Sequence, residues 1–232
     1  AEVCLDIDNG WARLVVRARA ERLALQRGRI AHLACAALDR QGVRPTGVRI
    51  RVRARHYVLA AGAIGTPALL LRSAAPDPHR TLGRRTFLHP TVVSAAAMPE
   101  RVDGYAGAPQ TIYSDHFLQR GPIDGPIGFK LEAPPLHPVL FGMTQQGFGA
   151  PHAEGMAQFA RTQVLIALLR GGFHAESEGG SVGLRADGSP VLAYPLTPFV
   201  WDGVRRALAA MAEIQFAAGA TSVLPVHERA RA

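Results

Sequence analysis

Polar and apolar residues alternate along the first part of the chain, with the period of a β-strand that buries one face. The alternation runs over Ala12–Leu23, resumes in Ile30–Leu38 and is cleanest in Val48–Arg55. Turn-forming residues separate these stretches, at Gln26–Arg29 and Gln41–Gly47. The pattern predicts an antiparallel meander with one dry face and one face lined by arginines.

A continuous apolar run, Tyr57–Ala61, follows the meander and predicts a strand covered on both faces. The next residues are Gly62-Ala63-Ile64-Gly65-Thr66-Pro67. A threonine directly before a proline is typical of a helix N-terminus, so we expect a helix that starts near Thr66. A strand, a glycine turn and a helix start together bring backbone N–H groups close to an anionic ligand.

The rest of the chain predicts a loop up to Pro90 and then a second region of short elements. Asp187-Gly188 is a hairpin signal, and Asp202–Ala218 has the apolar spacing of an amphipathic helix. Val164–His174 fits a strand or a helix. The further expected strands are Thr91–Ala97, Pro109–Asp115, Ile127–Glu132, Ser181–Arg185, Val191–Tyr194 and Ser222–Leu224. These elements predict an α+β fold with antiparallel sheets.

Composition narrows the class of protein. Of the 232 residues, 48% are hydrophobic and 19% charged, which excludes a disordered or collagen-like chain. Two cysteines, Cys4 and Cys35, are too few for a disulfide framework or a four-cysteine zinc site, and they indicate a reducing, cytoplasmic compartment. No apolar run approaches the ~20 residues of a membrane span, and no signal peptide pattern is present.

The net charge of +8 comes almost entirely from arginine, since Lys130 is the only lysine. An alanine- and arginine-rich chain is typical of a GC-rich genome. No aromatic residue interleaves with the arginines of the meander to stack bases, so a nucleic-acid partner is not expected. An alternative stays open, in which the chain is a non-catalytic α+β binding module that uses its arginine face for an acidic partner.

Motifs for metal and nucleophilic chemistry are absent. His174, Glu176 and Glu178 lie on one side of an extended stretch, as some metal ligands do, but a polar strand end explains them equally well, so no metal is predicted. H-E-x-x-H, C-x-x-C and G-x-S-x-G do not occur. Gly147-Phe148-Gly149 lacks the third glycine of a dinucleotide fingerprint.

Val58–Ser73 resembles the second signature of the glucose–methanol–choline (GMC) family of flavin oxidoreductases. Gly62-Ala63, Thr66-Pro67 and Leu70-Leu71 stand where that pattern has a small pair, Thr/Ser-Pro and two aliphatic residues, whereas Ala74-Ala75 replaces its Ser-Gly. Leu82–Pro90 is similar to the family's Gly-x-Asn-Leu-x-x-His-Pro segment, with Arg85 in place of Asn. Gly180–Tyr194 resembles the start of the family's C-terminal region.

The resemblance implies an FAD-dependent oxidation of an alcohol to a carbonyl, with a small-molecule alcohol as the partner. It also implies three parts: a portion of the FAD-binding domain at 1–90, a substrate-binding domain at 91–200, and a helix and strand at 201–232 that return to the FAD-binding domain. The family's ADP-binding glycine motif and its catalytic histidine motif are not found. We therefore expect an internal fragment that is inactive on its own.

The resemblance also implies site residues, mostly through backbone contacts where side chains are small or absent. The residues expected at FAD are Ala20, Ala60, Ala61, Gly62 and Thr66. His89 is a candidate on the substrate side. No catalytic base is assigned, because the family's base motif has no counterpart in this sequence.

Overall fold

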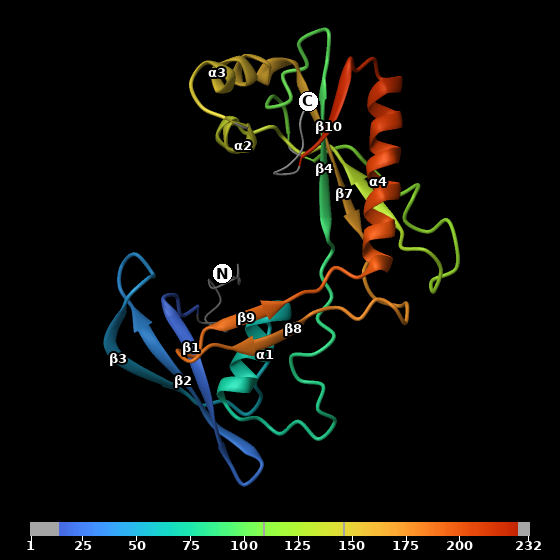
Figure 1. Cartoon of the computed structure of the whole chain (residues 1–232). Coiled ribbons are helices and arrows are strands. Elements are labelled where there is room, and N and C mark those ends of the chain that lie inside the picture. Colours follow the sequence, from blue (N-terminus) through green and yellow to red (C-terminus); the bar gives the residue numbers. More distant parts are fainter. Residues whose placement is uncertain (1–13, 109, 146, 227–232) are drawn as a thin grey trace, which may run out of the picture. The chain divides into compact units, whose positions relative to one another are not determined.

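The computed structural model describes residues 14–108, 110–145 and 147–226, and these divide into two compact units. The first unit contains residues 14–86 and 180–194, and the second contains residues 87–179 and 195–226. Both helices and strands are present, and all strand pairings among the described residues are antiparallel, so the α+β class is confirmed (Figure 1). Cys4 and the first two residues of the alternating stretch lie outside the described residues.

The first unit contains the predicted meander. Its strands are β1 (Ala18–Gln26), β2 (Arg29–Leu38) and β3 (Pro45–Val52), in that order. Ala34 pairs with Arg22 on one side and with Arg51 on the other, so these arginines share a face. Cys35, the next residue on β2, pairs with Ala20 and Ile50, which face the opposite way. The expected separation into an arginine face and an apolar face is confirmed.

The apolar face is only partly dry, contrary to the prediction. Helix α1 (Gly62–Arg72) lies against β1, where Leu23 is 2% exposed. On β3 the side chains of Val48 and Val52 are 59% and 40% exposed. The difference arises because alternation predicts which residues share a face, whereas dryness depends on what else covers that face.

Helix α1 begins one turn earlier than predicted, at Gly62. The hydroxyl of Thr66 accepts a hydrogen bond from the backbone N–H of Ala61 at 3.0 Å, so Thr66 caps the helix from inside its first turns. Pro67 is an interior residue of the helix and not its first. A glycine at position 62 permits the turn, because its φ of +72° is costly for other residues.

The predicted strand Tyr57–Ala61 is not a strand in this structure. A strand needs a neighbour for its backbone hydrogen bonds, and no described strand pairs with this segment. Val58 is 89% exposed. The hydroxyl of Tyr57 accepts from the N–H of Ala54 and donates to the carbonyl of Val52, which folds the segment back toward the end of β3.

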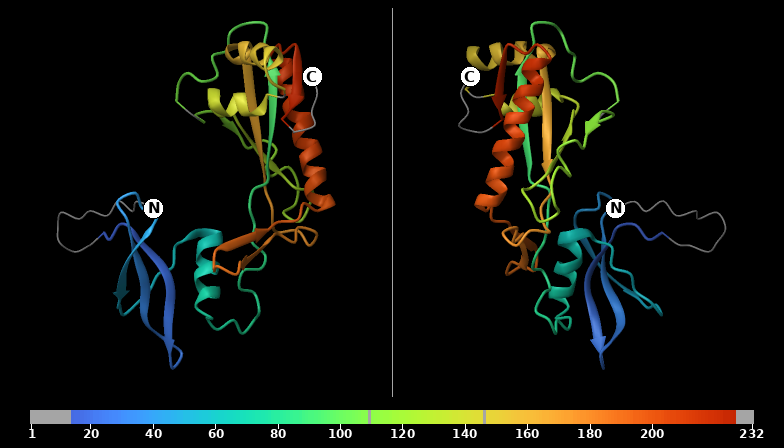
Figure 2. Two further views of the ribbon diagram at one scale, coloured as in Figure 1. Left: turned by 60° about the vertical axis from the view of Figure 1, so that its left-hand side comes forward. Right: turned by 90° about the vertical axis from the view of Figure 1, so that its right-hand side faces the viewer.

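The predicted hairpin is confirmed as β8 (Ser181–Leu184) and β9 (Pro190–Ala193). It lies beside α1 in the first unit, although the sequence analysis grouped these residues with the substrate-binding part (Figure 2). Arg72, the last residue of α1, connects β1 to the turn of the hairpin, because its guanidinium donates to the carbonyls of Glu21 and Gly188 at 3.0 and 3.3 Å.

A five-stranded antiparallel sheet forms the second unit. Its strand order is β10-β4-β7-β6-β5, with β4 (Thr91–Ala97), β5 (Tyr113–Ser114), β6 (Phe129–Glu132), β7 (Thr162–Leu169) and β10 (Ser222–Pro225). The strands predicted at 91–97, 127–132 and 222–224 are present. The ambiguous stretch at 164–174 begins as a strand, and only two residues of the stretch at 109–115 pair in the sheet.

Helix α4 (Pro198–Ala217) covers one face of this sheet (Figure 1). It begins four residues before the predicted Asp202, because Thr197 caps it and Pro198 occupies its first turn. Its buried side, which includes Val204 and Met211, packs with sheet residues in one apolar core. A buried polar contact joins the same layers, where the Ser94 hydroxyl donates to the side-chain oxygen of Gln215 at 2.6 Å.

Three short elements were not predicted. They are helix α2 (Pro138–Thr144), helix α3 (Ala150–Ala157) and a 3₁₀ turn at Phe159–Arg161. Each is shorter than the window over which apolar spacing can be recognised. Among the helices of the described residues, none combines the length and apolar character that a membrane span requires.

Candidate functional site

The N-terminal end of α1 gathers four of the five residues predicted at FAD. Ala60 and Ala61 are exposed and precede the helix, Gly62 is its first residue and Thr66 lies in its second turn. Apart from the adjacent residues and the backbone of its own helix, a Cβ placed on Gly62 would meet no atom of the described residues within 4 Å. The backbone at this point is therefore open to a neighbour that approaches closely.

The same helix end is suited to a negatively charged group. The first turn contains no acidic residue, and the side chain of Ala61, the N-cap residue, makes no capping hydrogen bond. The N–H of Ala61 donates to the hydroxyl of Thr66. The N–H groups of the first residues of a helix, by contrast, have no acceptor within the helix. These donors and the positive end of the helix dipole favour an anion such as a phosphate.

Ala20, the fifth predicted residue, lies on β1. It lines a cavity of about 520 Å³ whose wall also includes Arg72 and the turn Asp187–Pro190. The other four predicted residues are not part of the wall of this cavity.

In the second unit, the sheet face opposite α4 is the less covered one. Val93 and Ile166 pair across β4 and β7, as do Thr91 and Leu168, so these side chains share that face. Ile166 and Leu168 are half-buried, whereas Ala167 and Leu169 on the α4 side are fully buried. The result is a partly exposed apolar surface on a rigid sheet.

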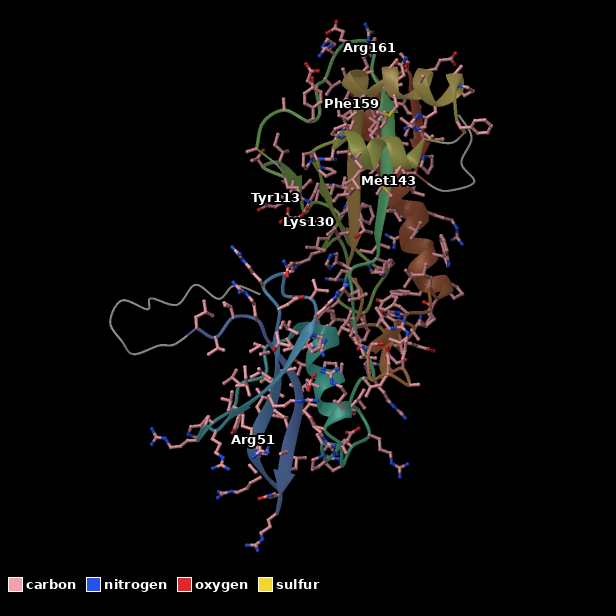
Figure 3. All side chains as sticks on the ribbon, turned by 90° about the vertical axis from the view of Figure 1, so that its left-hand side faces the viewer. Arg51, Tyr113, Lys130, Met143, Phe159 and Arg161 are labelled. Atoms are coloured by element: carbon pink, nitrogen blue, oxygen red, sulfur yellow. The ribbon has the colours of Figure 1, made fainter. Side chains whose placement is uncertain are left out.

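A polar cluster borders this apolar surface. Lys130 and Glu132 pair with Leu168 and Ile166 and therefore lie on the same face, with their side chains 2.8 Å apart. The ammonium group of Lys130 lies 4.2 Å from the centre of the Tyr113 ring, and both are labelled in Figure 3. Gln110 donates to the Glu132 carboxylate at 3.0 Å. The hydrogen bond to Glu132 is the main reason why the pKa of Lys130 is raised.

This cluster was missed by the sequence analysis. The signal was present in the alternation of Phe129-Lys130-Leu131-Glu132, which puts both charged residues on one face of a short strand. What the sequence does not contain is the pairing of that strand with β7, which sets the charges beside an apolar surface.

His89, the substrate-side candidate, belongs to the second unit and is exposed just before β4. Its carbonyl accepts from the hydroxyl of Thr91 at 3.0 Å. His174, weighed above as a metal ligand, stacks on Phe199 and accepts from the N–H of Glu176. The described part of the chain contains no group of three or more possible metal ligands.

The arginine face of the meander is partly neutralised within the chain. Glu21 forms ion pairs with both Arg19 and Arg49, which reduces the charge that this face offers to an acidic partner. Arg51 projects from the same face and is labelled in Figure 3.

Comparison with known proteins shows which proteins this chain resembles. A family model described as GMC oxidoreductase matches residues 7–91, a range that contains the meander and α1. Uncharacterized GMC-type oxidoreductases of Mycobacterium tuberculosis and Sinorhizobium fredii are 30% and 26% identical to the chain, over 92% and 94% of its length. A long-chain-alcohol oxidase of Arabidopsis thaliana is 26% identical over 77% of the chain.

The alignments cover most of this chain but less than half of each relative. The chain spans 31%, 40% and 22% of the lengths of these three relatives, respectively. The resemblance of Val58–Ser73 to the family's second signature lies inside the matched range and agrees with it. The chain is thus similar to GMC oxidoreductases in residues 7–91 and to GMC-type oxidoreductases along more than nine-tenths of its own length.

Proposed function

We propose that this chain contributes cofactor-binding and substrate-binding parts of an FAD-dependent enzyme that oxidises an alcohol to a carbonyl. The observation that carries the proposal is the start of α1, where exposed small residues, the positive φ of Gly62 and first-turn N–H groups that have no acceptor within the helix form an open, anion-favouring backbone surface. That surface lies within the segment that resembles the family signature.

The residues present fit a cofactor that carries phosphates. The N–H groups that follow Gly62 would hold a phosphate oxygen, while Ala60 and Ala61 would permit close approach because their side chains are small. Ala20, on β1, would contact another part of the same cofactor. When bound, FAD supplies the chemistry, because it accepts a hydride from the alcohol carbon.

The second unit supports a hydrophobic alcohol as the substrate. Val93, Ile166 and Leu168 form a partly exposed apolar surface, which stabilises a hydrocarbon chain by removing it from water. The relatives named long-chain-alcohol oxidases are consistent with such a substrate. We assign His89 to this substrate side as part of the proposal. No residue of the described chain is assigned as the base that takes the hydroxyl proton.

The location is also part of the proposal. Cys35 is a free, buried thiol, which suits a reducing compartment such as the cytoplasm.

The test uses the product of the complete reading frame around this sequence. The purified protein is mixed without oxygen with a series of primary alcohols, and the visible absorption of oxidised flavin is followed. We expect bound flavin that is bleached more efficiently by longer alcohols. Absence of flavin, or flavin that no alcohol reduces, would overturn the proposal.

A matched pair of variants tests the role of the apolar surface. Ile166→Ser removes apolar area from the sheet face, and Val52→Ser makes the same kind of change at a position of β3 that is 40% exposed. We expect Ile166→Ser to raise KM for long alcohols by roughly tenfold, as the loss of a buried side chain of this size implies, and Val52→Ser to leave KM unchanged. Equal KM values in both variants would exclude this face as the substrate side.

A further inference from the structure

A second cavity lies on the other side of the sheet, where α4 packs. Its volume is about 570 Å³, within the range of small-molecule sites. Residues 117–129 form one wall and α4 forms the other, and both belong to the second unit (Figure 1). Because this is the α4 side of the sheet, the cavity is separate from the face assigned to the alcohol.

The interior of the cavity is apolar. Phe117 stacks on Phe129 with ring centres 4.9 Å apart, and Ile127 lies beside them with 2% exposure. On the opposite wall, α4 presents Ala209 and Ala210. Small residues on the helix facing large rings on the other wall leave room for a hydrocarbon chain of a ligand.

The wall of the cavity also contains three arginines, Arg120, Arg170 and Arg206. Arg206 is fixed, because it donates to the carboxylate of Asp202 at 2.9 Å and to the carbonyl of Ile127 at 2.7 Å. The backbone of Arg170 is anchored to the segment after Ile127, since its N–H donates to the carbonyl of Gly128 at 2.8 Å. Arg120 joins from the segment after Phe117. Within the residues that the structure describes, the guanidinium groups of Arg120 and Arg170 form no hydrogen bond or ion pair.

The acidic residues of the cavity do not neutralise Arg120 and Arg170. Asp202 is already paired with Arg206. Glu213 lies seven residues further along α4, which is about 10 Å along the helix axis. Among the described residues, Arg120 and Arg170 therefore line a largely apolar cavity without an ion-pair partner.

We propose that this cavity binds a small amphipathic carboxylate, with its carboxylate at Arg120 and Arg170 and its hydrocarbon tail along Phe117, Leu118 and Ala209. A planar guanidinium matches a carboxylate through two parallel hydrogen bonds, which is the strongest pairing available to an exposed anion. The tail gains from burial against Phe117 and Leu118. The proposal is independent of the alcohol oxidation proposed above.

The test measures binding of octanoate to the 232-residue chain by isothermal titration calorimetry, with octanamide as an uncharged ligand of nearly the same size. We expect octanoate to bind at least about tenfold more tightly than octanamide, because charge-assisted bonds to arginine are made only by the carboxylate. The double variant Arg120→Gln/Arg170→Gln is expected to remove this difference. Arg51→Gln, an exposed arginine on β3, is the matched control and is expected to preserve it.

A second variant tests the location. Ala209 is an exposed helix position, so Ala209→Phe fills the cavity without entering the core, and circular dichroism verifies that the fold is kept. We expect this variant to bind neither ligand. The proposal is overturned if octanoate does not bind, if it binds no better than octanamide, if the arginine double variant keeps the preference, or if Ala209→Phe binds as the unaltered chain does.

Discussion

Removal of the Ser94 hydroxyl should destabilise the second unit more than a single small polar group would suggest. Ser94 is 1% exposed and donates to Gln215, which is also 1% exposed and donates to the Ser94 carbonyl and to Gln163. Ser94→Ala leaves the side-chain oxygen of Gln215 buried without this donor. An orphaned buried polar group costs about 1–3 kcal/mol.

The assay is urea unfolding followed by circular dichroism, with Ser114→Ala as the control on the exposed strand β5. We expect Ser94→Ala to lower the free energy of unfolding by about 1–3 kcal/mol and the control to change it by less than about 0.5 kcal/mol. The double variant Ser94→Ala/Gln215→Leu removes both partners, so its loss should be smaller than the sum of the single losses by about 1 kcal/mol. Additive losses, or a Ser94→Ala effect no larger than the control, would refute the reasoning.

Three further changes follow from local geometry. Gly203→Ala should lower the free energy of unfolding by about 1 kcal/mol net. The new methyl group would overlap Ile127 and lie 2.9 Å from Leu169, and this crowding outweighs the gain in helix propensity. Increased stability in urea unfolding would contradict this. The hydroxyl and N–H of Ser189 lower the pKa of Asp187, so Ser189→Ala should raise that pKa in an NMR titration of the carboxyl carbon. Because the pKa of Asp187 is lower in the folded state than in the unfolded state, the ionised carboxylate stabilises the fold above the unfolded-state pKa. This stabilisation is lost as the pH falls through the folded-state pKa. An unchanged titration in Ser189→Ala would argue against the hydrogen bond. Burial, and to a lesser extent the charge of Glu21, raises the pKa of the Cys35 thiol. In a Cys4→Ser background, iodoacetamide should therefore alkylate Cys35 at least roughly tenfold more slowly than free cysteine. Equal rates would show that the thiol is accessible.

Local patterns predicted the elements whose partners are close in sequence. The meander and the hairpin at Asp187-Gly188 follow from alternation and turn residues, because each strand pairs with its neighbour in the chain. A Thr-Pro pair marks the start of one helix in the structure but not of another. Thr197-Pro198 opens α4, which was predicted to begin at Asp202, whereas Thr66-Pro67 lies inside α1 because Gly62 already turns the chain.

Long-range pairing was beyond these patterns. Tyr57–Ala61 reads as a buried strand, but a strand depends on a neighbour and no described strand pairs with it. For the candidate site, the signature located Ala60–Gly62 and Thr66 at one helix end. The sequence could not place Ala20 at the cavity that Arg72 also lines, nor set Lys130 and Glu132 beside β7, because both depend on packing between distant segments.

The flavin content of a Gly62 variant tests the central claim most directly. In the product of the complete reading frame, Gly62→Val forces a β-branched residue into a φ of +72° at the proposed cofactor surface, whereas Arg53→Val alters an exposed residue just after β3. A left-handed backbone costs about 1–2 kcal/mol for such a residue, so FAD affinity should fall roughly tenfold. We predict a markedly lower ratio of flavin to protein absorbance in Gly62→Val and an unchanged ratio in Arg53→Val. Equal and undiminished ratios in both proteins would contradict a cofactor role for the start of α1.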